Sequence, residues 1–179
     1  VAQYNLPSVI RFSGEIDADR WKDAIIKTIE AYPYLKTRIV LEKSKVMLKR
    51  DDSIAIDNIP IVSVEEISDD ELEKENLKPF DLHHDQLFRF KIYKTPTETI
   101  LFSDVHHIIS DGESLDKLFT NIANAYQGIE IEKEEIDGYI NSLIENENEN
   151  SEKYESSRKF FQDRLAQEVD STVLTPNLN

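Results

Sequence analysis

Two adjacent histidines, His106 and His107, precede an aspartate-glycine pair, Asp111 and Gly112, by a short spacer. A neutral imidazole can accept a proton near pH 7, and a carboxylate close by can hold the loop that presents it. The spacing therefore predicts a loop able to carry out general base catalysis, with these four residues as its candidates. A simpler interpretation is also open, in which the histidines only end a strand and Asp111 caps the next helix.

The elements around these residues must hold them in place. Residues 87–94 and 99–105 are rich in β-branched, aromatic and other apolar residues and predict two neighbouring strands joined by a turn at 95–98. The second strand delivers both histidines to its own end. After Gly112, apolar residues at helical spacing predict an amphipathic helix that ends at Gly128.

The rest of the chain alternates strand and helix patterns up to residue 128. The predicted elements are a strand at 8–13, a helix from Asp17 or Asp19 to Tyr32, a hairpin at 34–41 and 46–48, a short strand at 59–64, and a helix that begins at the capping box of Ser68 and stops before Pro79. Residues 130–135 and 145–150 are acidic or low in complexity and predict linkers, with helical patterns at 136–144 and 151–169. We therefore expect one lobe at 1–128 and an acidic linker with helices at 129–179.

The histidine segment resembles the core motif of nonribosomal peptide synthetase condensation domains, Met-His-His-x-Ile-Ser-Asp-Gly-(Trp or Val)-Ser. The matching positions are His106, His107, Ile109, Ser110, Asp111, Gly112 and Ser114, whereas Val105 and Glu113 depart. The resemblance implies a chloramphenicol acetyltransferase-like fold, an α/β (α+β) two-layer sandwich with a mixed, largely antiparallel sheet covered by helices. Residues 154–165 and 174–176 resemble the family's crossover region, so the chain looks like the N-terminal lobe of such a domain.

A second family motif, Arg-His-Glu-x-Leu-Arg-Thr, is similar to residues 31–37 only at Leu35 and Thr37, with Lys36 keeping the charge. In the family its first arginine is thought to pair with the motif aspartate, and Ala31 cannot do so. Asp111 therefore needs another partner, for which the candidates are Arg11, Arg38 and Arg89. Residues 78–89 resemble a further family stretch, Pro-Phe-Asp followed by Pro-Leu-x-Arg, with Gln86 in place of its second proline.

The resemblance implies the roles of the motif residues. His107 corresponds to the catalytic residue, which removes a proton from an attacking amine or positions that amine. His106, Asp111 and Gly112 support the loop, with Gly112 allowing a sharp turn. On this interpretation Asp111→Asn impairs folding as well as chemistry, whereas His107→Ala leaves folding intact.

The implied reaction joins a donor acyl thioester on one carrier protein to the amine of an acceptor on another. Both substrates would travel on phosphopantetheine arms, with no cofactor bound directly, and the partners would be peptidyl or acyl carrier proteins and a second lobe. The isolated lobe is expected to be inactive. Three alternatives stay open: an epimerisation domain, a stand-alone acyltransferase of the same fold, and a carrier-binding lobe without turnover.

Composition restricts the remaining possibilities. A net charge of −15 and a pI near 4.6 argue against nucleic acid or an anionic membrane surface as partner. No cysteine is present, and no apolar run reaches the roughly 18 residues of a membrane span. A second histidine pair, His83 and His84 with Asp85, has no spaced third ligand, so we expect no metal site there. We expect a cytoplasmic protein, and Val1 in place of methionine is compatible with an excised fragment.

Overall fold

The computed structural model describes residues 2–14, 16–133 and 151–166. The chain separates into two compact units, Val1–Glu134 and Glu135–Asn179. The first unit holds the whole sheet and the histidine motif. None of the helices in the described residues is long and apolar enough to cross a membrane.

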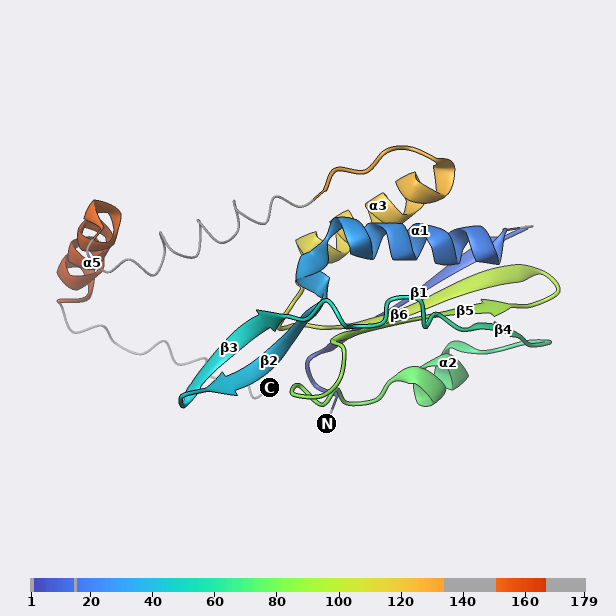
Figure 1. Cartoon of the computed structure of the whole chain (residues 1–179), viewed down its shortest axis with the longest axis horizontal. Helices are drawn as coiled ribbons and strands as arrows, with labels where there is room; N and C mark the ends of the chain where they lie inside the picture. Colours follow the sequence, from blue (N-terminus) through green and yellow to red (C-terminus); the bar gives the residue numbers. More distant parts are fainter. Residues whose placement is uncertain (1, 15, 134–150, 167–179) are drawn as a thin grey trace, which may run out of the picture. The chain divides into compact units, whose positions relative to one another are not determined.

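A four-stranded sheet in the order β1-β6-β5-β4 forms the centre of the first unit (Figure 1). Its strands are β1 (Asn5–Ser13), β6 (Glu98–His106), β5 (Phe88–Lys94) and β4 (Ile61–Ser63). The pairs β1/β6 and β5/β6 are antiparallel, and only β4 runs parallel to its neighbour β5. The predicted fold class, with a mixed and largely antiparallel sheet, is confirmed.

Strand β1 begins earlier than its alternating pattern predicts, at Asn5 rather than at Ser8. The reason is tertiary, because β1 pairs along the whole of β6 and Asn5 lies opposite His106. The N-terminal residues are therefore brought beside the histidine motif, which their own sequence does not indicate.

Helices cover both faces of this sheet (Figure 1). Helices α1 (Ala18–Ala31) and α3 (Gly112–Gln127) lie on one face, and α2 (Asp69–Asn76) lies on the other. The predicted ends are confirmed, because Asp17 caps α1, Ser68 and Glu71 form the capping box of α2, and Gly128 ends α3 with a φ of 79°.

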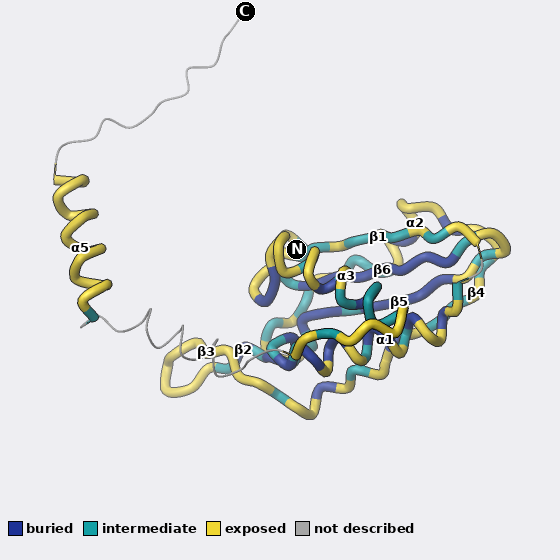
Figure 2. Tube along the Cα trace, turned by 90° about the horizontal axis from the view of Figure 1, so that it is seen from above, coloured by how far each residue is buried: buried dark blue, intermediate teal, exposed yellow. Residues whose placement is uncertain are grey.

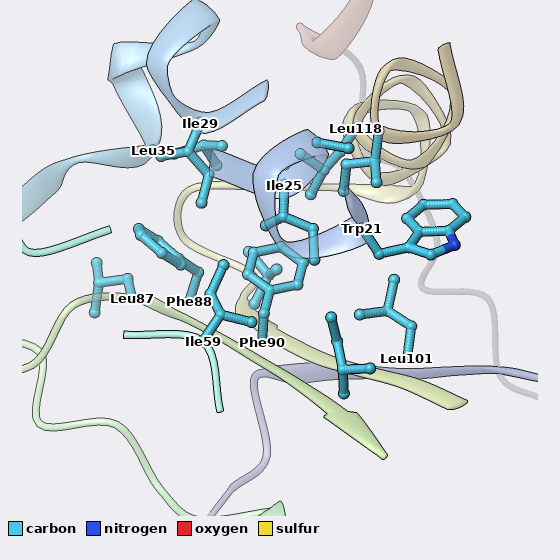
Figure 3. Packing of buried hydrophobic residues seen from close by; sticks show 14 of the residues in the cluster. Trp21, Ile25, Ile29, Leu35, Ile59, Leu87, Phe88, Phe90, Leu101 and Leu118 are labelled. Atoms are coloured by element: carbon cyan, nitrogen blue, oxygen red, sulfur yellow. The ribbon is translucent and has the colours of Figure 1, made fainter. Parts of the chain in front are cut away.

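Alternate residues of the strands pack against these two helical layers. Figure 3 shows Trp21, Ile25 and Ile29 of α1 and Leu118 of α3 above Phe88, Phe90 and Leu101 of the strands. On the opposite face, Tyr93, Ile100 and Phe102 pack with Ile67 and Leu72 in a second cluster. Strand β6 is consequently buried from Thr99 to Val105, as the dark tube between β1 and β5 shows (Figure 2). A rigid central strand therefore carries the histidines.

The predicted hairpin is present as a separate two-stranded sheet of β2 (Thr37–Glu42) and β3 (Lys45–Arg50). Lys43 and Ser44 both have positive φ, 49° and 65°, as expected of a two-residue hairpin turn. The prediction that its first strand starts at residue 34 was wrong. A short 3₁₀ turn, Pro33–Leu35, occupies that place because the fixed φ of proline suits the first position of a helical turn.

In the second unit the structure describes helix α5 (Glu152–Leu165), which Ser151 caps through its side chain. This confirms a helix within the predicted range 151–169, and its residues are exposed in Figure 2. The predicted helix at 136–144, the linker at 145–150 and the segment 174–176 lie outside the described residues.

Candidate active site

The histidine motif begins where β6 leaves the sheet. The backbone N–H of His106 donates to the carbonyl of Leu87 at 2.9 Å, and that of His107 donates to the carbonyl of Tyr4 at 2.8 Å. These two bonds tie the strand end to the start of β5 on one side and to the N-terminal segment on the other. The chain then turns through a bond from Ile109 N–H to the His106 carbonyl at 3.1 Å, and Ile109 enters the core.

The ring of His106 is built into the loop. It is half-buried, 6.2 Å from the Tyr4 ring and 5.8 Å from the edge-on ring of Phe80, measured between centroids. Its Nδ1 accepts a hydrogen bond from Ile108 N–H at 3.1 Å, which places the proton of the neutral ring on Nε2. Burial lowers the pKa of His106, and the neighbouring His107 lowers it further. The neutral form of His106 is therefore suited to holding the loop in place.

The side chain of His107 lies in solvent. Within residues 2–14, 16–133 and 151–166, its ring takes part in no hydrogen bond. An imidazole in this position keeps both nitrogens available for a substrate that approaches the end of β6. Of the two histidines, His107 is thus the one whose ring can exchange a proton with another molecule.

Asp111 caps helix α3. Its Oδ1 accepts hydrogen bonds from the Ser114 N–H at 2.8 Å and the Ser114 hydroxyl at 2.6 Å. Because both bonds favour the charged form, they lower the pKa of Asp111. The structure thus shows the helix cap of the simpler interpretation.

The predicted ion pair between Asp111 and Arg11, Arg38 or Arg89 is absent among the described residues. Each arginine reaches a carboxylate that the sheet register or a local turn brings closer. The observed pairs are Arg11 with Asp69 at 2.6 Å and Glu98 at 2.5 Å, Arg38 with Asp51 at 2.6 Å, and Arg89 with Asp104 at 3.1 Å and Asp85 at 3.7 Å.

Substitution of Asp111 is expected to act through the helix cap. Asp111→Ala removes the acceptor of both Ser114 bonds and lowers the melting temperature by a few degrees at pH 7. Asp111→Asn keeps a side-chain oxygen that can accept these bonds, so its melting temperature should fall by less. The folded-state pKa of Asp111 is lowered, so its carboxylate stabilises the fold above its unfolded pKa and ceases to do so as the pH falls through the folded value. Thermal unfolding of the wild type and both variants between pH 2 and pH 7 measures these effects. Equal melting temperatures for Asp111→Asn and Asp111→Ala would contradict the prediction.

Gly112 does not make the sharp turn expected of it. It is the first residue of α3, its φ lies outside the left-handed region, and a Cβ added there would meet no atom within 4 Å. The turn is made instead by the loop from His106 to Ser110, whose residues do not require glycine. A steric need for Gly112 within this chain is therefore not observed.

We expect Gly112→Ala to fold as well as the wild type. Alanine fits the open space and has the higher helix propensity, so the free energy of unfolding should change by less than about 1 kcal/mol. Urea denaturation measures the change, and a loss above that limit contradicts the prediction. A folded variant that has lost activity would instead show that a substrate uses the space beside Gly112.

A buried polar pair behind the motif was not singled out from the sequence. Asp104 on β6 is fully buried, and its Oδ2 accepts from Asn5 Nδ2 at 2.7 Å and from an Arg89 guanidinium nitrogen at 3.1 Å. Burial raises the pKa of Asp104, while Asn5 and Arg89 lower it. The sequence signal that could have revealed it is a carboxylate inside the otherwise apolar run of residues 100–105.

The second histidine pair does not converge on one point. His84 Nδ1 contacts the Asp81 carboxylate at 2.9 Å, whereas His83 Nδ1 contacts the Ile39 carbonyl at 3.2 Å. Across the described part of the chain, no three histidine, aspartate or glutamate side chains are grouped as metal ligands would be.

The sequence matches a family model and several peptide synthetases. The model described as "Condensation domain" matches residues 2–179. Tyrocidine synthase 2 of Brevibacillus parabrevis is 31% identical over 129 residues, which cover 72% of this chain and 4% of that protein. Surfactin synthase subunit 2 of Bacillus subtilis (strain 168) is 31% identical over 134 residues, or 74% of this chain and 4% of that protein.

Solved structures share the fold. The starter condensation domain of the rhizomide synthetase RzmA superposes with a TM-score of 0.76 and 15% identity, covering 92% of this chain and 43% of that chain. The X-domain from teicoplanin biosynthesis gives a TM-score of 0.71 with 21% identity, covering 96% of this chain and 40% of that chain. The chain thus spans less than half the length of these two structures and a small fraction of the curated synthases.

Proposed function

This chain belongs to the Condensation domain family, and we propose that it is the N-terminal lobe of a nonribosomal peptide synthetase condensation domain. The domain would form an amide bond between a donor acyl thioester and an acceptor amine. The observation that carries the proposal is His107, an exposed imidazole held at the end of a buried strand, whose ring nitrogens form no hydrogen bond with the described part of the chain. The match to tyrocidine and surfactin synthases supports peptide synthesis as the activity.

The proposed step is attack of the acceptor nitrogen on the thioester carbonyl carbon. A C–N bond forms, the C–S bond breaks, and the donor carrier's thiol leaves. The amine must lose one proton. Either His107 accepts this proton and passes it to the departing thiolate, or His107 orients the nitrogen lone pair while the thiolate takes the proton directly. His106 and Asp111 keep the loop in place, because the first is packed between aromatic rings and the second caps α3.

The substrates must arrive on other proteins. The chain has no cysteine, and its similarity to peptide synthetases supports a donor acyl group carried on the phosphopantetheine arm of a carrier protein. The solved relatives extend well beyond the span of this chain, and a second lobe would supply the other wall of the site. We therefore expect turnover from the polypeptide that contains both lobes, and none from residues 1–179 alone.

A condensation assay tests the proposal. The synthetase polypeptide that contains this chain is mixed with a donor-loaded and an acceptor-loaded carrier protein, and the tethered product is identified by mass spectrometry. Transfer of the donor onto the acceptor supports the proposal. Deuterium exchange at the α-carbon of one tethered residue, without a condensed product, would instead identify an epimerisation domain.

A further inference from the structure

A buried carboxylate lies in the strand that carries the histidines. Asp104 is directly opposite Arg89 on β5, and Asn5 on β1 is directly opposite His106. Because side chains alternate along a strand, Asp104 and His106 project from the same face of β6. Asp104 of β6, Arg89 of β5 and Asn5 of β1 therefore gather on one face of the sheet, and Asp104 precedes the first histidine of the motif by two residues.

The Arg89 side chain connects this carboxylate to the turn at residues 78–80. One guanidinium nitrogen donates to Asp104 Oδ2 at 3.1 Å and to the Lys78 carbonyl at 2.6 Å. The other donates to the Pro79 carbonyl at 3.1 Å. Asn5 Nδ2 reaches the same two acceptors, Asp104 Oδ2 at 2.7 Å and the Lys78 carbonyl at 3.0 Å. The turn is thus fixed to the sheet by three donor contacts, two from Arg89 and one from Asn5.

The same turn holds the His106 ring. The guanidinium carbon of Arg89 lies 3.7 Å from the centroid of the Phe80 ring, as in a cation–π contact. Phe80 in turn meets His106 edge-on, with centroids 5.8 Å apart and an interplanar angle of 82°. A continuous series of contacts therefore runs from Asp104 through Arg89 and Phe80 to His106.

Stability alone is a weak reason for this arrangement. Asp104 Oδ1 is buried without a hydrogen-bond partner among the described residues, and a buried ion pair can be replaced by apolar side chains with little loss of stability. The planar fork of arginine offers something that an apolar pair cannot, because its donors fix two carbonyls and a carboxylate in one geometry.

We propose that Arg89 and Asp104 are positioning residues that hold the turn at Lys78 to Phe80 against His106 and thereby fix the strand end that presents His107. The effect of this positioning on catalysis rests on the proposed condensation activity. Its effect on the His106 ring does not depend on that activity. Lysine at position 89 keeps the charge but cannot reproduce the fork or its stacking on Phe80.

A matched control exists on the same sheet. Arg11 lies on the same face of β1 and pairs with Asp69 and with Glu98, the first residue of β6. Its side chain is about as exposed as that of Arg89, 32% against 27%. Arg11→Lys therefore removes a comparable arginine beside the start of β6, at the opposite end of the strand from the motif.

The experiment compares Arg89→Lys with Arg11→Lys by two measurements. In the synthetase polypeptide we expect Arg89→Lys to lower kcat for condensation at least about tenfold, with KM for the loaded carrier proteins unchanged and Arg11→Lys at the wild-type rate. In residues 1–179, histidine NMR titration should show the pKa of His106 rising towards its ordinary value in Arg89→Lys alone, because the loosened turn admits water.

Two outcomes overturn the proposal: an unchanged His106 titration in a folded Arg89→Lys variant, or equal losses of kcat in the two lysine variants. If Arg89→Lys does not fold, Phe80→Leu leaves the ion pair intact and removes the ring that contacts His106, and the same His106 shift is then required. A wild-type synthetase without condensation activity refutes the proposed function. In that case the His106 titration still decides whether Arg89 positions the motif.

Discussion

Replacing His107 by alanine should lower the rate of product formation by about 10²- to 10⁴-fold, the usual contribution of a positioned general base. The side chain is exposed and makes no hydrogen bond within the described chain, so its removal leaves the core and the helix caps intact. The measurement is single-turnover condensation by the synthetase with loaded carrier proteins, followed by mass spectrometry of the tethered product. The melting temperature of the variant should match that of the wild type.

A histidine elsewhere on the surface supplies the control. The His84 side chain is 81% exposed and contacts Asp81. His84→Ala should retain the wild-type rate. If His107→Ala is as active as His84→Ala, the motif is structural, and a role for His107 in proton transfer or amine positioning is excluded.

Arg89→Leu should destabilise the first unit by about 3–5 kcal/mol, the usual cost of leaving a buried charge without its partner. Asp104 is fully buried, and in this variant its carboxylate keeps only the hydrogen bond from the neutral Asn5 amide among the described residues. The double variant Arg89→Leu/Asp104→Leu removes both charges and should recover most of this loss. Urea denaturation of residues 1–179 at pH 7 gives the free energy of unfolding of the wild type, the single variant and the double variant.

The stability of Arg89→Leu should also depend on pH, in a direction that the pKa of Asp104 predicts. Burial already raises the pKa of Asp104, and loss of Arg89 removes two influences that lower it. A raised carboxyl pKa means that the folded state binds more protons than the unfolded state, so stability falls as the pH rises through this range. The stability that Arg89→Leu loses relative to the wild type should therefore grow as the pH rises from the ordinary pKa of an aspartate towards neutrality. A loss that stays the same over this range would show that Asp104 is not the residue left unpaired.

Several features of this protein are encoded locally and could be read from the sequence. The ends of α1, α2 and α3 follow from Asp17, Ser68 and Gly128, because caps depend on residues within one turn of the helix end. The strand that precedes His106 was predicted from its apolar run, and the histidine motif was predicted at the junction between that strand and α3. Local sequence also placed the hairpin turn at Lys43 and Ser44 within the predicted connection.

Tertiary structure decided the partners of the charged groups. Asp111 is the exception, because it bonds to Ser114, three residues away, as the helix-cap interpretation of the sequence predicted and not to the distant arginine that the family resemblance implied. Arg89 and Asp104 are 15 residues apart and meet because β5 and β6 pair in one register, and Asn5 joins them across 99 residues because β1 extends to the end of β6. Helix caps and apolar periodicity are properties of a few consecutive residues, whereas an ion pair depends on which strands adjoin and in what register, and that is fixed only when the sheet assembles.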